Sequence, residues 1–183
     1  MNDKPGAALP PRPKIAIIGY SGSGKSTLAQ LLSERLSLPV LYVDTIQFLP
    51  GWVEREREEK LALMRGFLEA NDKTGWIVDG NYSNLEFERR MKEADLIIFL
   101  NFNRVDCFIR AYKRSRAYKN KTRPSMTEGC DEKFDGEFKK WLLLEGRSKK
   151  RGMRFKETIA KYPEKSVVLK NQRQLDKFKE SVL

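Results

Sequence analysis

The residues best suited to chemistry lie together in one glycine-rich segment near the start of the chain. Residues 19–26 read Gly-Tyr-Ser-Gly-Ser-Gly-Lys-Ser and match the pattern G-x-x-x-x-G-K-[ST], between an apolar run and a helical pattern. The glycines let the backbone wrap tightly, so that successive amide groups and the positive end of the following helix can hold a phosphate. The lysine would reach the β- and γ-phosphates of a nucleoside triphosphate, and the hydroxyl of Ser26 would ligate Mg²⁺. We therefore predict a nucleotide-binding loop made by Gly19, Ser21, Gly22, Ser23, Gly24, Lys25, Ser26 and Thr27.

Two aspartates each follow an apolar run that has the composition of a buried strand. Asp79 follows Trp-Ile-Val and precedes a glycine, an arrangement typical of a carboxylate that lies beside a phosphate loop and helps to hold Mg²⁺. Asp44 follows Leu-Tyr-Val and opens a loop. Because ligands of open sheets bind beyond the carboxyl ends of the strands, we expect both aspartates in the site. Asp79 would join Ser26 at the metal, and Asp44 would orient or accept the proton of an acceptor hydroxyl; a turn-capping role is the alternative for each aspartate.

The chain contains no histidine, which removes several classes of catalysis. Histidine general bases, Ser-His-Asp and Cys-His triads and nearly every zinc site are excluded. Phosphoryl transfer does not require histidine, because its transition state is loose and needs positioning and charge neutralisation more than a strong base.

Basic residues are concentrated in two stretches. Residues 104–123 carry eight basic residues and one acidic residue, and residues 147–156 carry six basic residues and no acidic one, whereas the net charge of the whole chain is +11. The rest of the chain is therefore slightly acidic, and the basicity belongs to two local surfaces. Such surfaces attract phosphates, either of a nucleic acid or of a nucleotide.

Arginines in these stretches are the expected groups to neutralise transition-state charge. In the helical pattern over 104–118, apolar positions 105, 108, 109 and 112 mark the expected buried face. Arg110 and Arg114 then project opposite that face, whereas Arg116 returns to it and is the better candidate to turn back over the phosphates. A second set falls on one face of a later helical pattern if that pattern is unbroken: Arg147, Arg151 and Arg154. A solvated face is the alternative for these residues.

Short apolar runs alternate with helical patterns along the chain. The runs at 14–18, 40–43, 76–78, 96–100 and 167–169 predict buried parallel strands. Helical patterns cover 24–36, 54–70, 84–92, 104–118 and 172–182, and the spacing of Ser83 and Glu86 predicts a capping box. This alternation predicts an α/β doubly wound fold, a three-layer sandwich with a five-stranded parallel sheet between helices. Residues 119–162 predict a loop followed by one long appended helix.

The composition fits one domain. The chain has 183 residues, of which 40% are hydrophobic and 33% are charged. Its longest apolar run, 96–100, is far too short to cross a bilayer, so no membrane partner is expected. The proline-rich residues 1–13 predict a flexible tail, residues 14–183 predict a single domain, and the two cysteines suggest a reducing, cytoplasmic location.

Several further motifs accompany the generic phosphate loop, and those over 79–82 and from Arg123-Pro124 to Gly129-Cys130 are more specific than it. They are Asp44 through Pro50-Gly51-Trp52, residues 76–82, residues 110–114 with Arg123-Pro124, and Glu128-Gly129-Cys130. Together they resemble the adenylate-kinase-like group of small P-loop kinases, and most closely the DNA topology modulation (FlaR-like) proteins. The resemblance implies a sheet ordered 2-3-1-4-5, ATP and Mg²⁺ at the phosphate loop, an acceptor near both aspartates, and a helical lid over about 110–130 whose arginines close over the site. Asn81-Tyr82 stands where adenylate kinases have Phe-Pro-Arg, so the resemblance does not point to AMP as the acceptor.

Two hypotheses of function follow from these observations. The first is an ATP- and Mg²⁺-dependent phosphotransferase that acts on a nucleotide or on another small hydroxylated or phosphorylated molecule. The alternative is a nucleotide-dependent DNA-binding regulator whose basic surfaces contact backbone phosphates, although the sequence contains no helix-turn-helix or zinc element. For the first hypothesis the catalytic candidates are Lys25, Asp44, Asp79, Arg110, Arg114, Arg116 and Arg123.

The substrates suggest further candidate residues. Phe48 and Trp52 could stack on a base or pack in the core. Asn171 belongs to a loop that could cover the nucleotide base, whereas a GTPase is not expected because no Asn-Lys-x-Asp follows the fourth strand. The residues predicted to contact the acceptor are Asp44, Phe48, Trp52, Asn81 and Tyr82.

Overall fold

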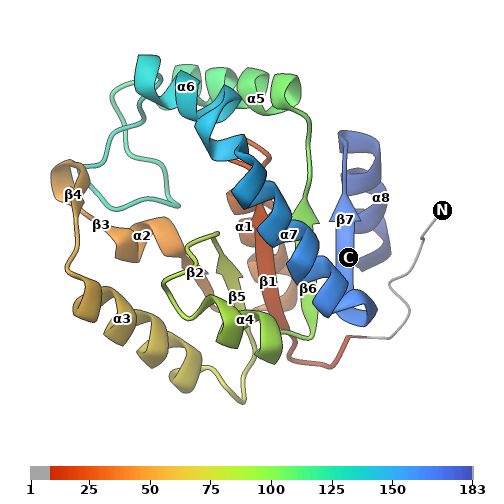
Figure 1. Cartoon of the computed structure of the whole chain (residues 1–183). Helices are drawn as coiled ribbons and strands as arrows, with labels where there is room; N and C mark the ends of the chain where they lie inside the picture. Colours follow the sequence, from red (N-terminus) through yellow and green to blue (C-terminus); the bar gives the residue numbers. More distant parts are fainter. Residues whose placement is uncertain (1–8, 183) are drawn as a thin grey trace.

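A parallel β-sheet forms the centre of the computed structural model, which describes residues 9–182 (Figure 1). In this part of the chain the sheet has five strands in the order β2-β5-β1-β6-β7. Numbered along the chain, these strands have the predicted order 2-3-1-4-5. The strands are β1 (Lys14–Gly19), β2 (Val40–Tyr42), β5 (Trp76–Asp79), β6 (Leu96–Leu100) and β7 (Ser166–Leu169).

Helices cover both faces of the sheet and make the predicted three-layer sandwich. Helices α3, α4 and α7 pack on one face, and helices α1 and α8 pack on the other. Strand β1 serves both layers, because Ala16 and Ile18 face the first and Ile15 and Ile17 face the second. The helices are α1 (Lys25–Leu36), α2 (Val43–Gln47), α3 (Arg57–Ala70), α4 (Phe87–Glu93), α5 (Arg104–Ala117), α6 (Gly136–Leu143), α7 (Lys149–Lys161) and α8 (Gln172–Val182).

The register of the strands brings the chemically important residues to one edge. Ile17 of β1 pairs with Asp79 of β5, and Tyr42 of β2 also pairs with Asp79. All strand pairs in this sheet are parallel, so their carboxyl ends meet beside the phosphate loop that follows β1. Figure 1 shows α5 and α6 lying over this edge. The fold therefore places the loop, Asp79 and the residues after β2 around one space.

The segment between β2 and α3 is more structured than the sequence indicated. Asp44 lies in the short helix α2 rather than in an open loop, and a hairpin of β3 (Phe48–Leu49) and β4 (Val53–Glu54) follows. A 3₁₀ turn (Pro50–Trp52) joins the two strands. The hairpin includes Glu54, the first residue predicted for the next helix, and α3 begins at Arg57 instead.

The predicted capping box does not form. Helix α4 begins at Phe87, and Glu86 precedes it in the left-handed conformation with φ 50°. The Glu86 carboxylate accepts a hydrogen bond from Arg65 Nε at 2.7 Å rather than turning back toward Ser83.

The segment after α5 contains two helices instead of one. Helix α6 ends at Leu143, a 3₁₀ turn (Glu145–Arg147) follows, and α7 begins at Lys149. A Cβ atom on Gly146 would lie 2.8 Å from the carbonyl oxygen of Trp141, so only glycine lets the chain turn this closely against α6. A last 3₁₀ turn (Pro163–Lys165) leads into β7.

Residues 1–8 of the predicted N-terminal tail lie outside the described residues. In the described part of that segment, Leu9 packs against the core, and Pro13 is buried with its carbonyl accepting the Trp76 amide at 3.2 Å. Packed structure therefore begins before Lys14. None of the described helices has the length and apolar character needed to cross a bilayer.

Candidate phosphoryl-transfer site

The phosphate loop joins the end of β1 to the start of α1 and approaches α5 closely. Gly22 has φ 77°, and a Cβ atom there would lie 2.4 Å from the carbonyl oxygen of Cys107 on α5. Lys25 Nζ donates a hydrogen bond to the carbonyl of Tyr20 at 3.1 Å, across the loop. Burial lowers the pKa of Lys25, and the charges of Asp79 and Asp44 oppose this shift. Both predicted aspartates therefore lie within electrostatic reach of the loop lysine.

Ser26 and Asp79 meet as predicted. Ser26 Oγ donates to Asp79 Oδ2 at 2.6 Å. Asp79 is only 6% exposed, and its Oδ1 has no hydrogen-bond partner within residues 9–182. Burial raises the pKa of Asp79, while Lys25 and the Ser26 hydroxyl oppose the shift. A buried carboxylate oxygen without a partner, next to a serine hydroxyl, fits a site for a hard cation.

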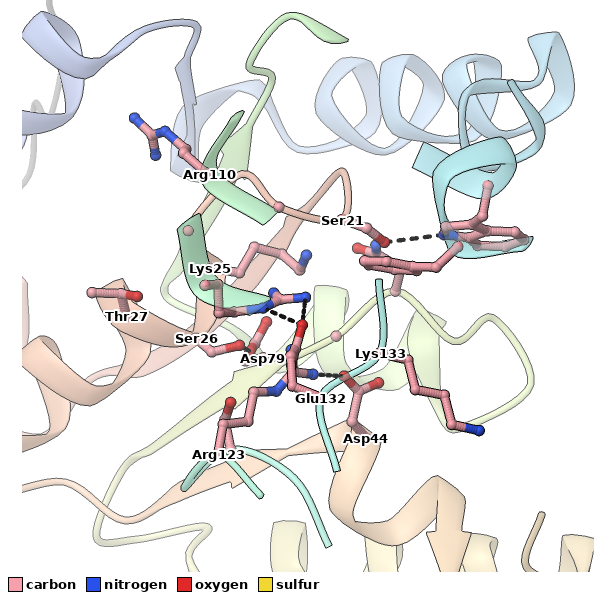
Figure 2. A pocket seen from close by; sticks show the side chains of 18 of the residues that line it. Ser21, Lys25, Ser26, Thr27, Asp44, Asp79, Arg110, Arg123, Glu132 and Lys133 are labelled. Atoms are coloured by element: carbon pink, nitrogen blue, oxygen red, sulfur yellow. Dashed lines mark hydrogen bonds and ion pairs between the residues drawn. The ribbon is translucent and has the colours of Figure 1, made fainter. Parts of the chain in front are cut away.

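Asp44 lies at one end of an ion-pair network on the other side of the cavity (Figure 2). Tyr82 Oη donates to Asp44 Oδ1 at 2.9 Å, and Arg123 Nη2 donates to Oδ2 at 3.0 Å. Arg123 also pairs with Glu132 at 3.4 Å, and Arg114 pairs with the same carboxylate at 2.6 Å. Burial lowers the pKa of Arg114 and raises the pKa of Tyr82.

A cavity of about 1420 Å³ is lined both by the Ser26–Asp79 pair and by the network around Asp44. It opens along the carboxyl edge of the sheet, between the phosphate loop, the hairpin β3–β4 and helices α5, α6 and α7. Its lining includes most of the predicted residues, namely Ser21, Gly22, Gly24, Lys25, Ser26, Thr27, Asp44, Phe48, Trp52, Asp79, Asn81, Tyr82, Arg110, Arg114 and Arg123.

Helix α5 presents a different face to the protein than predicted. Val105, Ile109 and Tyr112 are exposed, whereas Cys107 and Ala111 are buried. The reason is the close approach at Gly22, where only small side chains fit between the helix and the phosphate loop. Figure 2 shows Arg110 beside the loop, and Arg114 also lines the cavity. Arg116, the candidate favoured by periodicity, is exposed and is not among the described residues that line the cavity.

Arg110 joins the phosphate loop to the segment after β7. Its Nη1 donates to the Ser23 carbonyl at 3.0 Å, its Nη2 donates to Gln172 Oε1 at 2.5 Å, and the guanidinium lies 4.2 Å from the centre of the Phe102 ring. Asn171 instead accepts the amide of Gln174 at 3.0 Å at the start of α8. The predicted base-contacting position is therefore a helix cap, and its neighbour Gln172 lines the cavity.

Two of the predicted loop residues, Gly19 and Ser23, are not among the described residues that line the cavity. Asn81 accepts the amide of Gly19 at 3.0 Å and donates to its carbonyl at 2.6 Å, which ties the end of β5 to the end of β1. The Ser23 side chain is fully buried. Phe48 and Trp52 are half-buried and lie edge to face with ring centres 5.4 Å apart. They line the cavity rather than the hydrophobic core.

Further contacts to the site come from Trp141, which the sequence did not mark, and from the second set of predicted arginines. Trp141 Nε1 of α6 donates to Ser21 Oγ at 3.1 Å. The Arg147 guanidinium lies 4.0 Å from the centre of the Tyr20 ring and donates to the Phe102 carbonyl at 2.9 Å. Arg151 lies 4.4 Å from the centre of the Trp141 ring, and with Arg154 it lines the cavity. The basic stretch that contains these arginines was visible in the sequence, but Trp141 had no local signal.

The sequence pattern also did not identify Arg90, which is completely buried. It donates to the carbonyls of Gly80 at 3.1 Å and Tyr82 at 3.0 Å. Burial lowers its pKa to about 10, against the attraction of Asp79. Arg90 therefore holds the turn that carries the site residues after β5.

Solved structures show where this architecture occurs. A gluconokinase from Sinorhizobium meliloti 1021 aligns with a TM-score of 0.52 and 15% identity, over 96% of this chain and 91% of that chain. Deoxyadenosine kinase from M. mycoides with bound dATP aligns with a TM-score of 0.53 and 17% identity, over 92% of this chain and 98% of that chain. At these identities the likeness shows a shared fold.

The sequence comparisons give the family. No curated relative matches the chain. The sequence profile of a family described as an AAA domain matches residues 15–140, a range that begins in β1 and includes the phosphate loop, both aspartates and the arginines of α5. That range is more than half of the chain, so the protein belongs to the AAA domain family.

Proposed function

We propose that the protein is an ATP- and Mg²⁺-dependent phosphotransferase that acts on a nucleotide or another small hydroxylated or phosphorylated molecule. The contact between Ser26 Oγ and Asp79 Oδ2 beside Lys25 carries this proposal. A hydroxyl, a buried carboxylate and a lysine around one glycine-rich loop are the groups that hold a nucleoside triphosphate with its cation. Asp44 lies on the acceptor side of the same cavity.

The residues fit Mg²⁺ through Ser26 and Asp79. Asp79 has an unpartnered oxygen, and the pair lies at the start of α1, where an anionic phosphate is favoured. A cation bound there would neutralise charge on the β- and γ-phosphates. Lys25 would exchange its bond to the Tyr20 carbonyl for a bond to phosphate.

Asp44 is the residue positioned to act on the acceptor hydroxyl. Its side chain is 37% exposed and is held from two directions by Tyr82 and Arg123. A carboxylate fixed in this way can accept the hydroxyl hydrogen and direct the oxygen toward the γ-phosphorus.

Residues 110–130 would form a lid whose arginines neutralise the transferred group. Arg110, Arg114 and Arg123 line the cavity from α5 and the following loop. This arrangement supports a role in which the arginines act mainly on transition-state charge. The names of the two structures with the same fold, a gluconokinase and a deoxyadenosine kinase, describe kinases of small hydroxylated compounds and support a small acceptor.

The Lys25→Ala variant tests the proposal. Lys25 faces the loop rather than the core, so the variant should fold and should lose Mg-ATP binding by more than tenfold in calorimetric titration. The matched control is Lys73→Ala, which changes an exposed lysine in the turn before β5. Equal Mg-ATP affinity in the folded Lys25→Ala variant would refute the assignment of the phosphate loop.

A further inference from the structure

Cationic side chains around the cavity fall into two groups according to whether a carboxylate neutralises them. One group surrounds the phosphate loop: Lys25, Arg110, Arg151 and Arg154. Within residues 9–182, none of these four makes an ion pair; Lys25 bonds a carbonyl, Arg110 bonds a carbonyl and an amide, and Arg151 stacks on an indole. Their charge is therefore available for a polyanion such as a triphosphate.

On the acceptor side, the arginines are already neutralised. Arg123 pairs with Asp44 at 3.0 Å and with Glu132 at 3.4 Å, and Arg114 pairs with Glu132 at 2.6 Å. Two carboxylates thus balance two guanidinium groups. The Glu132 side chain is only 5% exposed, so it depends on both arginines for compensation.

Lys133 also lines the cavity, and within residues 9–182 it makes no ion pair with this network. Its side chain is exposed, and its ammonium lies 5.2 Å from the centre of the Trp52 ring. In Figure 2 the ammonium points away from Asp44 and Glu132. Lys133 therefore does not neutralise Asp44 or Glu132, and the two carboxylates are compensated by Arg123 and Arg114.

This balance determines which acceptor the site can hold. A phosphate on the acceptor would bring about two further negative charges next to Asp44 and Glu132. It would be repelled by both carboxylates and would compete with them for the arginines, and displacement of buried Glu132 would leave that carboxylate without compensation. An uncharged hydroxyl compound has no such cost, because it can donate to Asp44 and accept from the remaining guanidinium hydrogens. The flat rings of Phe48 and Trp52 offer an apolar surface for a ring.

We propose that the acceptor is an uncharged ring compound that carries a hydroxyl group, a nucleoside or a neutral sugar, and not a phosphorylated or carboxylated molecule. The inference rests on the proposed phosphotransferase function. In the reaction, the acceptor oxygen forms a bond to the γ-phosphorus of ATP, and the bond from that phosphorus to the β–γ bridging oxygen breaks. ADP leaves with the bonding electrons, and the hydroxyl proton passes to Asp44.

The direct test measures transfer of label from [γ-³²P]ATP to two acceptor pools. The neutral pool contains the common ribo- and deoxyribonucleosides, hexoses and pentoses, and the anionic pool contains nucleoside monophosphates, hexose phosphates and gluconate. We expect a labelled product from the neutral pool only. Labelled product from the anionic pool would overturn the inference while leaving the phosphotransferase proposal intact. No product from either pool with intact Mg-ATP binding would overturn the neutral acceptor, and loss of Mg-ATP binding itself would overturn the proposed function.

Removing one carboxylate tests the charge balance independently. In Glu132→Gln the two arginines gain one uncompensated positive charge, so AMP should bind at least tenfold more tightly than to the wild type in the presence of a non-hydrolysable ATP analogue. The matched control is Glu128→Gln, an exposed residue of the same loop that is not among the described cavity-lining residues. Calorimetric titration measures both variants. Unchanged AMP affinity in Glu132→Gln, or the same gain in Glu128→Gln, would overturn the inference.

Discussion

Replacement of Asp79 by asparagine should separate the stability of the protein from its reaction. Burial raises the pKa of Asp79 even though Lys25 and the Ser26 hydroxyl favour the charged form. A carboxyl group with a raised folded-state pKa stabilises the fold below its unfolded pKa of about 4, and this contribution is lost as the pH rises through the folded pKa. At pH 7 the ligand-free Asp79→Asn variant should therefore be at least as stable as the wild type. That advantage should shrink as the pH falls toward about 4.

The sign reverses when Mg-ATP is present. The 2.6 Å contact with Ser26 places the Asp79 carboxylate next to any cation on the Ser26 hydroxyl. Two unit charges about 4 Å apart interact by about 4 kcal/mol at an effective dielectric constant of about 20. Asparagine keeps an acceptor oxygen but loses the charge, and loss of only a third of this energy, about 1.4 kcal/mol, lowers the rate about tenfold. We expect at least a tenfold fall in turnover and a weaker dependence on Mg²⁺.

Thermal unfolding with and without Mg-ATP, and turnover against Mg²⁺ concentration, measure the two effects. The matched control is Asp72→Asn, which removes an exposed carboxylate paired with Lys14 at 2.6 Å and should change turnover little. An Asp79→Asn variant with wild-type turnover and wild-type Mg²⁺ dependence would make Asp79 a turn residue and refute the reasoning.

Four further substitutions test other parts of the site. Asp44→Asn should lower phosphoryl transfer about 100-fold while ATP affinity, measured by calorimetry, changes less than about twofold; a proportional loss of ATP affinity would contradict the acceptor role. In steady-state kinetics, Arg123→Ala should lower turnover more than ATP affinity, whereas Arg116→Ala should leave both unchanged. The DNA-binding alternative would gain support if the protein bound duplex DNA with a steep salt dependence and Arg123→Ala reduced the log-log slope of that dependence by about one unit. Arg90→Met should lower the free energy of unfolding by about 3 kcal/mol in urea titration, because two buried carbonyls lose a charged donor; a loss below about 1 kcal/mol would count against that role.

The sheet and the phosphate-binding side could be predicted because their signals are local. Each strand is a short apolar run, and the rule that ligands bind beyond parallel strand ends brought Asp79 to the loop. The contact between Ser26 and Asp79 spans 53 residues, yet Ser26 belongs to a local glycine-rich motif and Asp79 follows an apolar run, and each signal is readable by itself. The sequence therefore identified both residues of this contact, but not the distance between them.

The face of α5 was predicted wrongly for a physical reason. Periodicity places the largest apolar residues inside, but the phosphate loop comes so close at Gly22 that Cys107 and Ala111 face inward instead. Arg110 and Arg114 then share the inner half of the helix. Packing distance, which no periodic pattern contains, decided which arginines reach the cavity.

The acceptor side was only partly predictable because its partners come from a segment without strands. Glu132 reaches Arg123 and Arg114 from the loop between α5 and α6, and Trp141 reaches Ser21 across 120 residues. A glutamate in a mildly acidic loop and a tryptophan on an amphipathic helix look like surface and core residues in sequence. Only the folded arrangement gives them their contacts.

The hairpin β3–β4 and the loop after α5 are joined by bonds that do not depend on any substrate. Thr127 Oγ1 lies 2.7 Å from the Phe48 carbonyl and 3.0 Å from the Thr45 carbonyl, and the Gly51 amide donates to the Gly129 carbonyl at 3.0 Å. Cys130 Sγ donates to the Leu49 carbonyl at 3.2 Å. The hairpin and the loop therefore move as one unit, and any movement of the loop carries Phe48 and Trp52 with it. If the loop moved outward, the hairpin would move with it, and the cavity would widen on both sides at once. The acceptor would therefore enter, and the transferred group would be exposed to water, in the same event.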